Sequence, residues 1–390
     1  MIGRIFSSAT LAIFLGFVAF QAGSRTSSGK HGDSPVQRKE LLHAPDFDDV
    51  SAFAPNDIRR IDAWLHSQVE FAEYPGLSVA VVREGEVVYQ NALGFQDIET
   101  NTKATAETSY HVASVTKVFT TLIAATLHDR GVINLDQPVS KYLPEKAAIS
   151  STPEIGATIT LRQLASHTSG LPRGVPGRVQ SVEGRYELNP KRLYAHLAAV
   201  ELDSEPGTNE RYSNLGIGLL GHALEFATKR QFGQLVQDMV CQPLKLHRTT
   251  ISKTDQLSVA TGYSRLIPRR PETHSYLERL APTGGLVTSV GDLAKFLIAQ
   301  MKPGVISEAV LSQLHTPTKL RDGSEAGTGL GWAVRSRRSI GRILKKNGGR
   351  NNCKAWIGFS PEHQVGVAVV TNCGGPSKWG NSWGTLEAGE

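Results

Sequence analysis

The sequence predicts an α+β fold, α/β in the broad sense. One antiparallel β-sheet is built from both chain ends and flanked by helices, with a mostly helical domain inserted between its two halves. Apolar runs bounded by turn residues indicate strands near both ends, whereas the stretch between them has apolar residues at helical spacing. The predicted strands cover 77–82, 86–89, 329–334, 339–346, 354–359 and 365–371.

Each predicted element has a local signal. A first helix begins near Pro55, because Ile58, Ile61, Leu65 and Val69 recur at spacings of three and four. The other elements are a hairpin turn at 83–85, a helix from Ser114 to near Gly131, a helix from the cap Thr160 through Leu164, a helix over 216–228, and a helix over 292–301 capped by Ser289. We assign 51–380 to one domain, with an α/β part at about 51–112 and 285–373 and a helical part at about 113–284.

The first 50 residues predict an exported chain. Arg4 supplies a positive start, 9–20 form an apolar core, and 22–24 are small residues suited to cleavage. The apolar run falls short of the roughly 18 residues that a membrane span needs. We therefore expect a signal peptide at 1–24, a polar linker at 25–50, and a secreted or periplasmic protein with no stable membrane span after cleavage. A membrane anchor formed by an uncleaved signal is the alternative.

Composition argues against several classes of partner. The 390 residues carry a formal net charge of +6, but the basic residues are scattered or lie in the N-terminal tail. No nucleic-acid motif accompanies them, no fixed-period repeat indicates a solenoid, and no Cys or His spacing fits a metal site. We expect a monomer that acts on a small-molecule or peptide substrate without a cofactor, metal or nucleic acid.

The chain has three cysteines. The predicted strands 354–359 and 365–371 form a hairpin that brings Cys353 opposite residue 372 or 373. A Cys353–Cys373 disulfide could then form in an oxidising compartment. We expect Cys241 to be a small buried apolar residue.

A Ser-x-x-Lys motif at the start of an apolar stretch is the first chemical signal. Ser114 and Lys117 precede the apolar run 118–127. Residues three apart on a helix have Cβ atoms roughly 5–6 Å apart, so the ammonium can lie against the hydroxyl and activate it as a nucleophile. The same motif at 27–30 lies in a polar stretch, whereas a lysine at the start of a buried helix needs a partner. A lysine that snorkels from a helix end is the structural alternative.

Two further motifs follow in chain order. Tyr212 and Asn214 form a Tyr-x-Asn motif before an apolar helix. The phenol would be a general base if nearby cations held it as phenolate, and the asparagine amide could bind a substrate carbonyl. A Lys-Asn-Gly-Gly motif begins at Lys346, where glycines permit close approach by an extended substrate. A packed tyrosine with a turn asparagine, and a basic hairpin turn, are the structural alternatives.

The order Ser-x-x-Lys, Tyr-x-Asn, Lys-x-Gly resembles that of the serine β-lactamase-related family, which includes class C β-lactamases, DD-peptidases and penicillin-binding proteins. The resemblance covers most of the chain, from about Ile58 to Asn372. Further stretches that resemble family landmarks lie at 135–144, 161–172, 206–208, 283–289, 329–332 and 357–361. The resemblance implies a β-lactamase/transpeptidase-like version of the predicted fold.

The resemblance also implies the roles of the first two motifs. Ser114 is the nucleophile, and Lys117 and Tyr212 share the removal of its proton; which of the two is the formal base stays open. Asn214 orients Lys117 and holds a substrate amide. The oxyanion hole consists of the backbone N–H groups of Ser114 and Gly349, aimed at charge that develops in the transition state.

The third motif binds substrate in the same family pattern. Lys346 favours the phenolate form of Tyr212 and attracts a substrate carboxylate, with Asn347 and Gly348 beside it. Asn347 stands where class C β-lactamases usually have threonine, and residues 352–353 replace a glycine and an aromatic residue. These departures alter the strand that lines the site, so the resemblance does not fix the substrate.

The implied function is an exported serine acyl hydrolase with an acyl-enzyme mechanism. Its substrates would be D-amino-acid peptides, as for a DD-carboxypeptidase or endopeptidase, or β-lactams. An esterase on the same fold and a penicillin-binding sensor with poor turnover are the alternatives. His167 has no aspartate context for a catalytic triad, so we expect a loop or packing residue there. After Gly374 no amphipathic period follows, whereas relatives usually finish with a helix.

Overall fold

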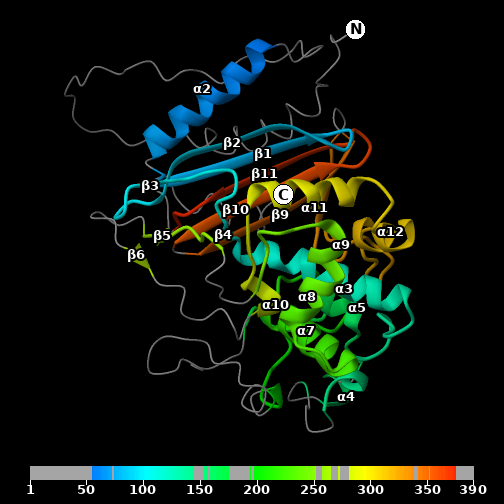
Figure 1. Ribbon diagram of the computed structural model, residues 1–390. Helices are drawn as coiled ribbons and strands as arrows, with labels where there is room; N and C mark the ends of the chain where they lie inside the picture. The colour runs from blue at the N-terminus through cyan, green and yellow to red at the C-terminus, as the bar shows by residue number, and fades with distance from the viewer. Residues whose placement is uncertain are drawn as a thin grey trace, which may run out of the picture.

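A seven-stranded antiparallel sheet forms the centre of the computed structural model, and strands from both chain ends lie side by side in it (Figure 1). The structure describes residues 55–72, 74–144, 149, 153–156, 158–174, 194, 197–251, 257–264, 271–272, 281–337, 341–350 and 352–374. The predicted signal peptide, linker and C-terminal tail lie outside these residues. The strand order is β3-β2-β1-β11-β10-β9-β8.

The strands of the sheet are β1 (Gly76–Arg83), β2 (Glu86–Asp97), β3 (Thr102–Lys103), β8 (Ala333–Arg337), β9 (Gly341–Arg350), β10 (Cys353–Ser360) and β11 (Val365–Thr371). Two short pairs lie outside it: β4 (Tyr110–His111) with β7 (Val287–Thr288), and β5 (Gly262–Tyr263) with β6 (Pro271–Glu272). The predicted fold class, one antiparallel sheet drawn from both chain ends, is confirmed.

The central pairing of the sheet joins β1 to β11, so that Leu77 pairs with Thr371. Three strands differ from the prediction by two residues or more at an end. β2 is longer than predicted, because its polar Gln90 and Asn91 continue the ladder with β1. β8 begins at Ala333 rather than at 329, because 329–332 close a turn, and β9 continues to Arg350 rather than ending at 346.

The helices lie on both faces of the sheet (Figure 1). They are α2 (Pro55–Ala72), α3 (Thr116–Asp129), α4 (Pro153–Gly156), α5 (Leu161–Ala165), α7 (Asn214–Thr228), α8 (Phe232–Val236), α9 (Gln242–Leu244), α10 (Ala281–Gly284), α11 (Val290–Met301) and α12 (Glu308–His315), with short helical turns η1 (Ala113–Val115), η2 (Val139–Tyr142) and η3 (Gln237–Cys241). Thr160 and Ser289 cap α5 and α11 as predicted. α7 begins two residues before the predicted 216, because Ser213 caps it.

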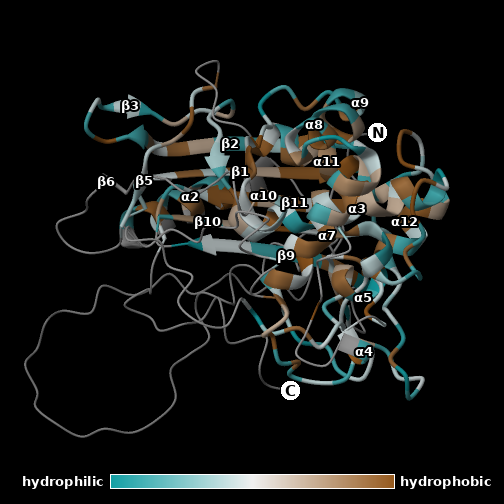
Figure 2. Cartoon of the chain, turned by 90° about the horizontal axis from the view of Figure 1, so that it is seen from below, coloured by the Kyte–Doolittle hydropathy of each residue, from teal (hydrophilic) through white to brown (hydrophobic). Residues whose placement is uncertain are grey.

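Two hydrophobic clusters fix the layers. Ile61 and Leu65 of α2 pack with Val79 and Val367 on one face of the sheet. On the other face a larger cluster joins the sheet to α11, α3 and the remaining helices. Figure 2 shows hydrophobic residues along the central strands and these helices, and hydrophilic residues around β3. α3 is buried along most of its length, and Phe119 stacks on Phe296 of α11 with ring centroids 4.1 Å apart.

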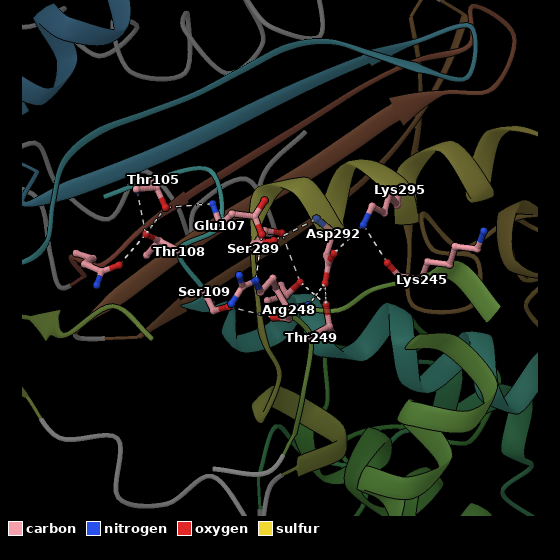
Figure 3. A network of polar contacts seen from close by, with 12 residues as sticks. Thr105, Glu107, Thr108, Ser109, Lys245, Arg248, Thr249, Ser289, Asp292 and Lys295 are labelled. Atoms are coloured by element: carbon pink, nitrogen blue, oxygen red, sulfur yellow. Dashed lines mark hydrogen bonds and ion pairs between the residues drawn. The ribbon is translucent and has the colours of Figure 1, made fainter. Parts of the chain in front are cut away.

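A polar network fixes the start of α11 (Figure 3). Asp292 is buried, and its carboxylate accepts from the backbone N–H of Arg248 at 2.6 Å and from the hydroxyl of Thr249 at 2.8 Å. The Arg248 guanidinium in turn donates to Glu107 at 3.0 Å. The network therefore ties the segment before β4 to the helix that covers the sheet.

The cysteines are buried thiols. Cys353 and Cys373 are not joined by a disulfide, so the predicted bridge is absent from the described structure. The β10–β11 ladder ends at the Lys354–Thr371 pair, and Cys373 instead forms a β-bridge with Tyr263. Cys241 is buried as predicted. Within the part of the chain that the structure describes, no helix combines the length and apolarity that a membrane crossing requires.

One buried histidine makes stability depend on pH. The His315 ring lies against Phe359 with centroids 5.2 Å apart, and its Nε2 lies 3.1 Å from the Gln300 side-chain oxygen. Burial, with a smaller contribution from the Arg342 charge, lowers the pKa of His315 from 6.5 to about 3. Below pH about 6.5 the unfolded chain binds a proton here that the folded chain does not. Stability is therefore full above that pH and is lost as pH falls toward 3, by about 1.4 kcal/mol per pH unit.

We expect His315→Gln to flatten the fall of the unfolding free energy between about pH 6.5 and pH 5, because the variant cannot take up this proton. Urea denaturation at stepped pH measures the slope. The matched control is His247→Gln, which replaces a histidine at an exposed position. Equal slopes in wild type and His315→Gln would contradict the assignment.

Candidate active site

Ser114 lies in η1, at the point where the chain enters α3. The residue before it, Ala113, has a left-handed backbone with φ 45°, which is uncommon for a residue with a side chain. Thr116 holds this turn: its hydroxyl donates to the Ala113 carbonyl at 2.7 Å and accepts from the N–H of Leu286 at 3.0 Å. The strained turn before the serine is thus fixed from two sides.

Lys117 is fully buried one helical turn beyond Ser114. Its Nζ donates to Ser114 Oγ at 3.0 Å, as the spacing predicted, and to the backbone carbonyl of Thr283 at 2.7 Å. A buried ammonium needs such partners, because taking a charge out of water is costly. Thr283 belongs to α10. A second hydrogen bond joins the same helix to α3, because the Thr120 hydroxyl donates to the Pro282 carbonyl at 2.6 Å.

Tyr212 completes the contacts of the serine hydroxyl. Its phenolic oxygen lies 2.8 Å from Ser114 Oγ. Three cations surround its ring: Lys117 Nζ at 5.0 Å, Lys346 Nζ at 5.1 Å and the Arg173 guanidinium carbon at 5.0 Å from the ring centroid. Three positive charges this close to the ring favour the phenolate form of Tyr212. Residues from four separate parts of the sequence therefore meet at one phenol ring.

β9 forms the wall of the site beside η1. Lys346 is buried, and Gly348 approaches so closely that a Cβ on it would lie 2.0 Å from the Val112 carbonyl oxygen and 3.0 Å from the Ser114 nitrogen. Only glycine permits this approach. β8 pairs with β9 from Gly341 to Lys345, so the pairing that the structure describes stops before the Lys-Asn-Gly-Gly motif.

The remaining predicted residues lie around these groups. Asn214 is the first residue of α7, and its N–H donates to the Arg173 carbonyl at 2.9 Å. Gly349 follows Gly348 in β9 and is exposed. Asn347 pairs with Trp356 and, by strand alternation, points to the other sheet face from Lys346. The roles of these residues in substrate binding and in the oxyanion hole stay predictions.

Sequence reasoning missed two contacts of the site. The Thr283 carbonyl accepts a hydrogen bond from Lys117, a contact that the sequence analysis did not predict. A backbone carbonyl leaves no residue-type signal, although the stretch 283–289 had marked the segment. Arg173 directly follows the stretch 161–172, and an arginine in a Gly/Pro-rich loop carries no pattern of its own. Its place over the Tyr212 ring is visible only in three dimensions.

Arg350 links the two sides of the site. Its guanidinium donates to the Gly284 carbonyl at 2.8 Å, so the end of β9 is joined to the residue after Thr283. His167 is buried, as expected for a packing residue, and its ring faces the Tyr212 ring with centroids 4.6 Å apart. No group of three or more metal-ligating side chains is found in the described part of the chain.

The chain is similar in sequence to known proteins. The family model described as Beta-lactamase matches residues 61–388. The chain is 27% identical over 323 residues to Protein flp of Staphylococcus aureus (strain MW2), covering 80% of this chain but 63% of that protein. It is 27% identical over 364 residues to the Beta-lactamase of Escherichia coli (strain K12), covering 82% of this chain and 90% of that one.

Two solved structures share the fold. The octameric penicillin-binding protein homologue from Pyrococcus abyssi superposes with a TM-score of 0.72 at 25% identity, covering 86% of this chain and 78% of its own. The Beta-lactamase/D-alanine Carboxypeptidase from Yersinia pestis gives a TM-score of 0.70, covering 84% of this chain and 96% of its own; at 24% identity it shows the fold alone. Because one of these homologues is octameric, a monomer remains a prediction for this chain.

We expect Gly348→Ala to slow reaction at Ser114 by about 10-fold or more, because the new methyl group must push β9 away from η1 and so disturb groups that need placement within about 1 Å. The labelling rate with a fluorophosphonate reagent, which reacts with activated serines, measures this without knowledge of the substrate. Gly304→Ala is the matched control, since nothing lies within 4 Å of its new methyl group. A wild-type labelling rate in Gly348→Ala would show that the close approach is irrelevant to the nucleophile.

Proposed function

Because the chain belongs to the β-lactamase family, we propose that it is a serine acyl hydrolase that works through an acyl-enzyme on Ser114. One observation carries the proposal: Ser114 Oγ lies 2.8 Å from the Tyr212 oxygen and 3.0 Å from Lys117 Nζ. A hydroxyl within hydrogen-bond reach of a general base and of a cation that holds its oxygen has the arrangement of an activated nucleophile. This chain spans only 63% of the length of Protein flp, so no activity of that protein is carried over to it.

The reaction has two steps. Ser114 Oγ attacks the substrate carbonyl carbon while its proton passes to the adjacent base. The carbonyl oxygen becomes an oxyanion facing the N–H groups of Ser114 and Gly349. When the bond to the leaving group breaks, the leaving group takes the proton and the acyl-enzyme remains. Water then attacks the ester carbon, gives its proton to the same base, and the acid is released as Ser114 regains its own proton.

Tyr212 is the better-placed proton acceptor. Lys117 Nζ already donates to the Thr283 carbonyl, a contact that suits an ammonium, whereas Tyr212 sits among three cations. Lys117 would then stay charged, hold the serine oxygen and stabilise the phenolate. This division of labour is part of the proposal.

The proposed substrate is a D-amino-acid peptide or a β-lactam that carries a carboxylate. Lys346 and Arg173 flank Tyr212, so they would place a carboxylate next to Ser114. The outer edge of β9 beyond Lys345 would accept the backbone of an extended substrate. Secretion through the signal at 1–24 also belongs to this proposal, and sequencing the N-terminus of the mature protein tests it.

Replacing each reacting group tests the mechanism. We expect Ser114→Ala to abolish covalent labelling by a fluorescent penicillin, and Lys117→Ala and Tyr212→Phe each to slow acylation by about 10²-fold or more, a typical loss of general-base catalysis. The matched control is Tyr89→Phe, which alters the other Tyr-x-Asn motif, on β2. Wild-type acylation in Lys117→Ala or Tyr212→Phe would refute the roles given, and no labelling of wild type would favour ester or peptide substrates.

A substrate panel tests the carboxylate. Arg173→Gln is expected to raise KM for a D-Ala-D-Ala peptide by about 10-fold, the scale of one charge-assisted contact. Hydrolysis of the neutral ester p-nitrophenyl acetate should fall less, because Arg173 affects that reaction only as one of the three charges beside Tyr212. Arg211→Gln is the control. Arg211 directly precedes Tyr212 in the chain, but it is exposed and pairs with Asp203 at 3.4 Å. Equal losses on the peptide and on the ester would mean that Arg173 acts on the serine site rather than on the carboxylate.

A further inference from the structure

His167 lies in the loop after α5, between that helix and the start of α7. It is 3% exposed, so the surrounding structure fixes its ring. The ring meets the Tyr212 ring at 4.6 Å between centroids with an interplanar angle of 41°. Tyr212 therefore has a buried aromatic neighbour in addition to its three cations.

Three contacts of His167 fall on three consecutive residues. Its carbonyl accepts from the N–H of Arg211 at 2.7 Å, its ring packs on Tyr212, and its Nδ1 accepts from the N–H of Ser213 at 3.2 Å. Ser213 is itself fixed, because its Oγ caps α7 through the N–H of Gly216 at 2.9 Å. His167 thus contacts each residue of the segment 211–213, which carries the phenol.

The ring must stay neutral to make these contacts, because a protonated imidazole has no acceptor nitrogen. Burial and then the charges of Lys346, Lys117 and Arg173 lower the pKa of His167 well below its usual value. Nδ1 therefore remains an acceptor, and the proton of the neutral ring lies on Nε2. A fourth cation does not form beside Tyr212 over the working pH range.

The conformation of His167 does not stabilise the folded protein. Its φ is 61°, in the left-handed region that residues with side chains rarely adopt, and its buried Nε2 has no hydrogen-bond partner among the described residues. Backbone strain and an unpartnered buried donor each lower the stability of the folded chain. Such features concentrate at functional sites.

We propose that His167 is a positioning residue for Tyr212, which holds the phenol at hydrogen-bond distance from Ser114 and so sets the rate at which the serine reacts. The proposal rests on the proposed function, since it concerns the same nucleophile. His167 does not touch the serine or a substrate; it acts through Tyr212.

Two substitutions distinguish the contribution of the aromatic ring of His167 from that of its acceptor nitrogen. His167→Phe keeps an aromatic ring but leaves the Ser213 N–H without its acceptor. His167→Asn keeps an acceptor and suits a φ of 61°, because asparagine tolerates the left-handed region, but it lacks the ring. If His167→Phe fails to fold, His167→Asn still carries the test.

The readout is fluorophosphonate labelling, in which the endpoint counts competent sites and the time course gives the rate constant per site. We expect both variants to label fully but about 10- to 100-fold more slowly, the cost of misplacing a reacting group. His315→Asn is the matched control, a buried histidine with an aromatic contact outside the site. It should lower the melting temperature without changing the rate constant. A wild-type rate constant in both His167 variants would overturn the proposal.

A double-mutant cycle with Tyr212→Phe tests whether His167 acts through the phenol. In that background His167→Asn should cause no further loss, because the group that it positions is gone. Losses that multiply would show that His167 acts elsewhere, and the proposal would fall. If wild type itself is not labelled, the proposed nucleophile fails first, and that result is distinct from a labelled wild type with unaffected His167 variants.

Discussion

The buried ammonium of Lys117 is the constraint on which the site depends. A full charge in the interior is tolerated only where carbonyl and hydroxyl oxygens surround it, and here those oxygens come from Thr283 and Ser114. α10, which supplies the carbonyl, is held in turn by Arg350 from β9 and by Thr120 from α3. Satisfying one charge therefore joins the helical part to the sheet at the place where the nucleophile lies.

Charge around Tyr212 is distributed unevenly. Three cations approach its ring, whereas His167, which packs on the same ring, is kept neutral by burial and by the same cations. His167 therefore adds no further positive charge beside the phenol near neutral pH.

Much of this arrangement could be predicted from sequence, because the strongest signals are local. The apolar run after Lys117, the caps Thr160 and Ser289 and the glycines beside Lys346 each report their own surroundings. What could not be predicted depends on distant contacts. The Thr283 carbonyl has no sequence signal, and the Cys353–Cys373 bridge was inferred from a hairpin that ends one pair too early. β2 was underestimated because its polar half is stabilised by pairing with β1 rather than by burial of its side chains.

The pairing of β1 with β11 has a consequence for how the molecule is made. Leu77 must find Thr371, and the ladder that they begin lies in the middle of the sheet rather than at its edge. Contacts of such high sequence separation form slowly, since a long loop has to close before they give any stabilisation. A ribosome that has synthesised most of this chain holds at most the β1–β2–β3 side of the sheet, and Gly348 reaches Ser114 only after β9 has been added. Until that moment the nascent polypeptide carries its serine without the strand that forms the wall of the site.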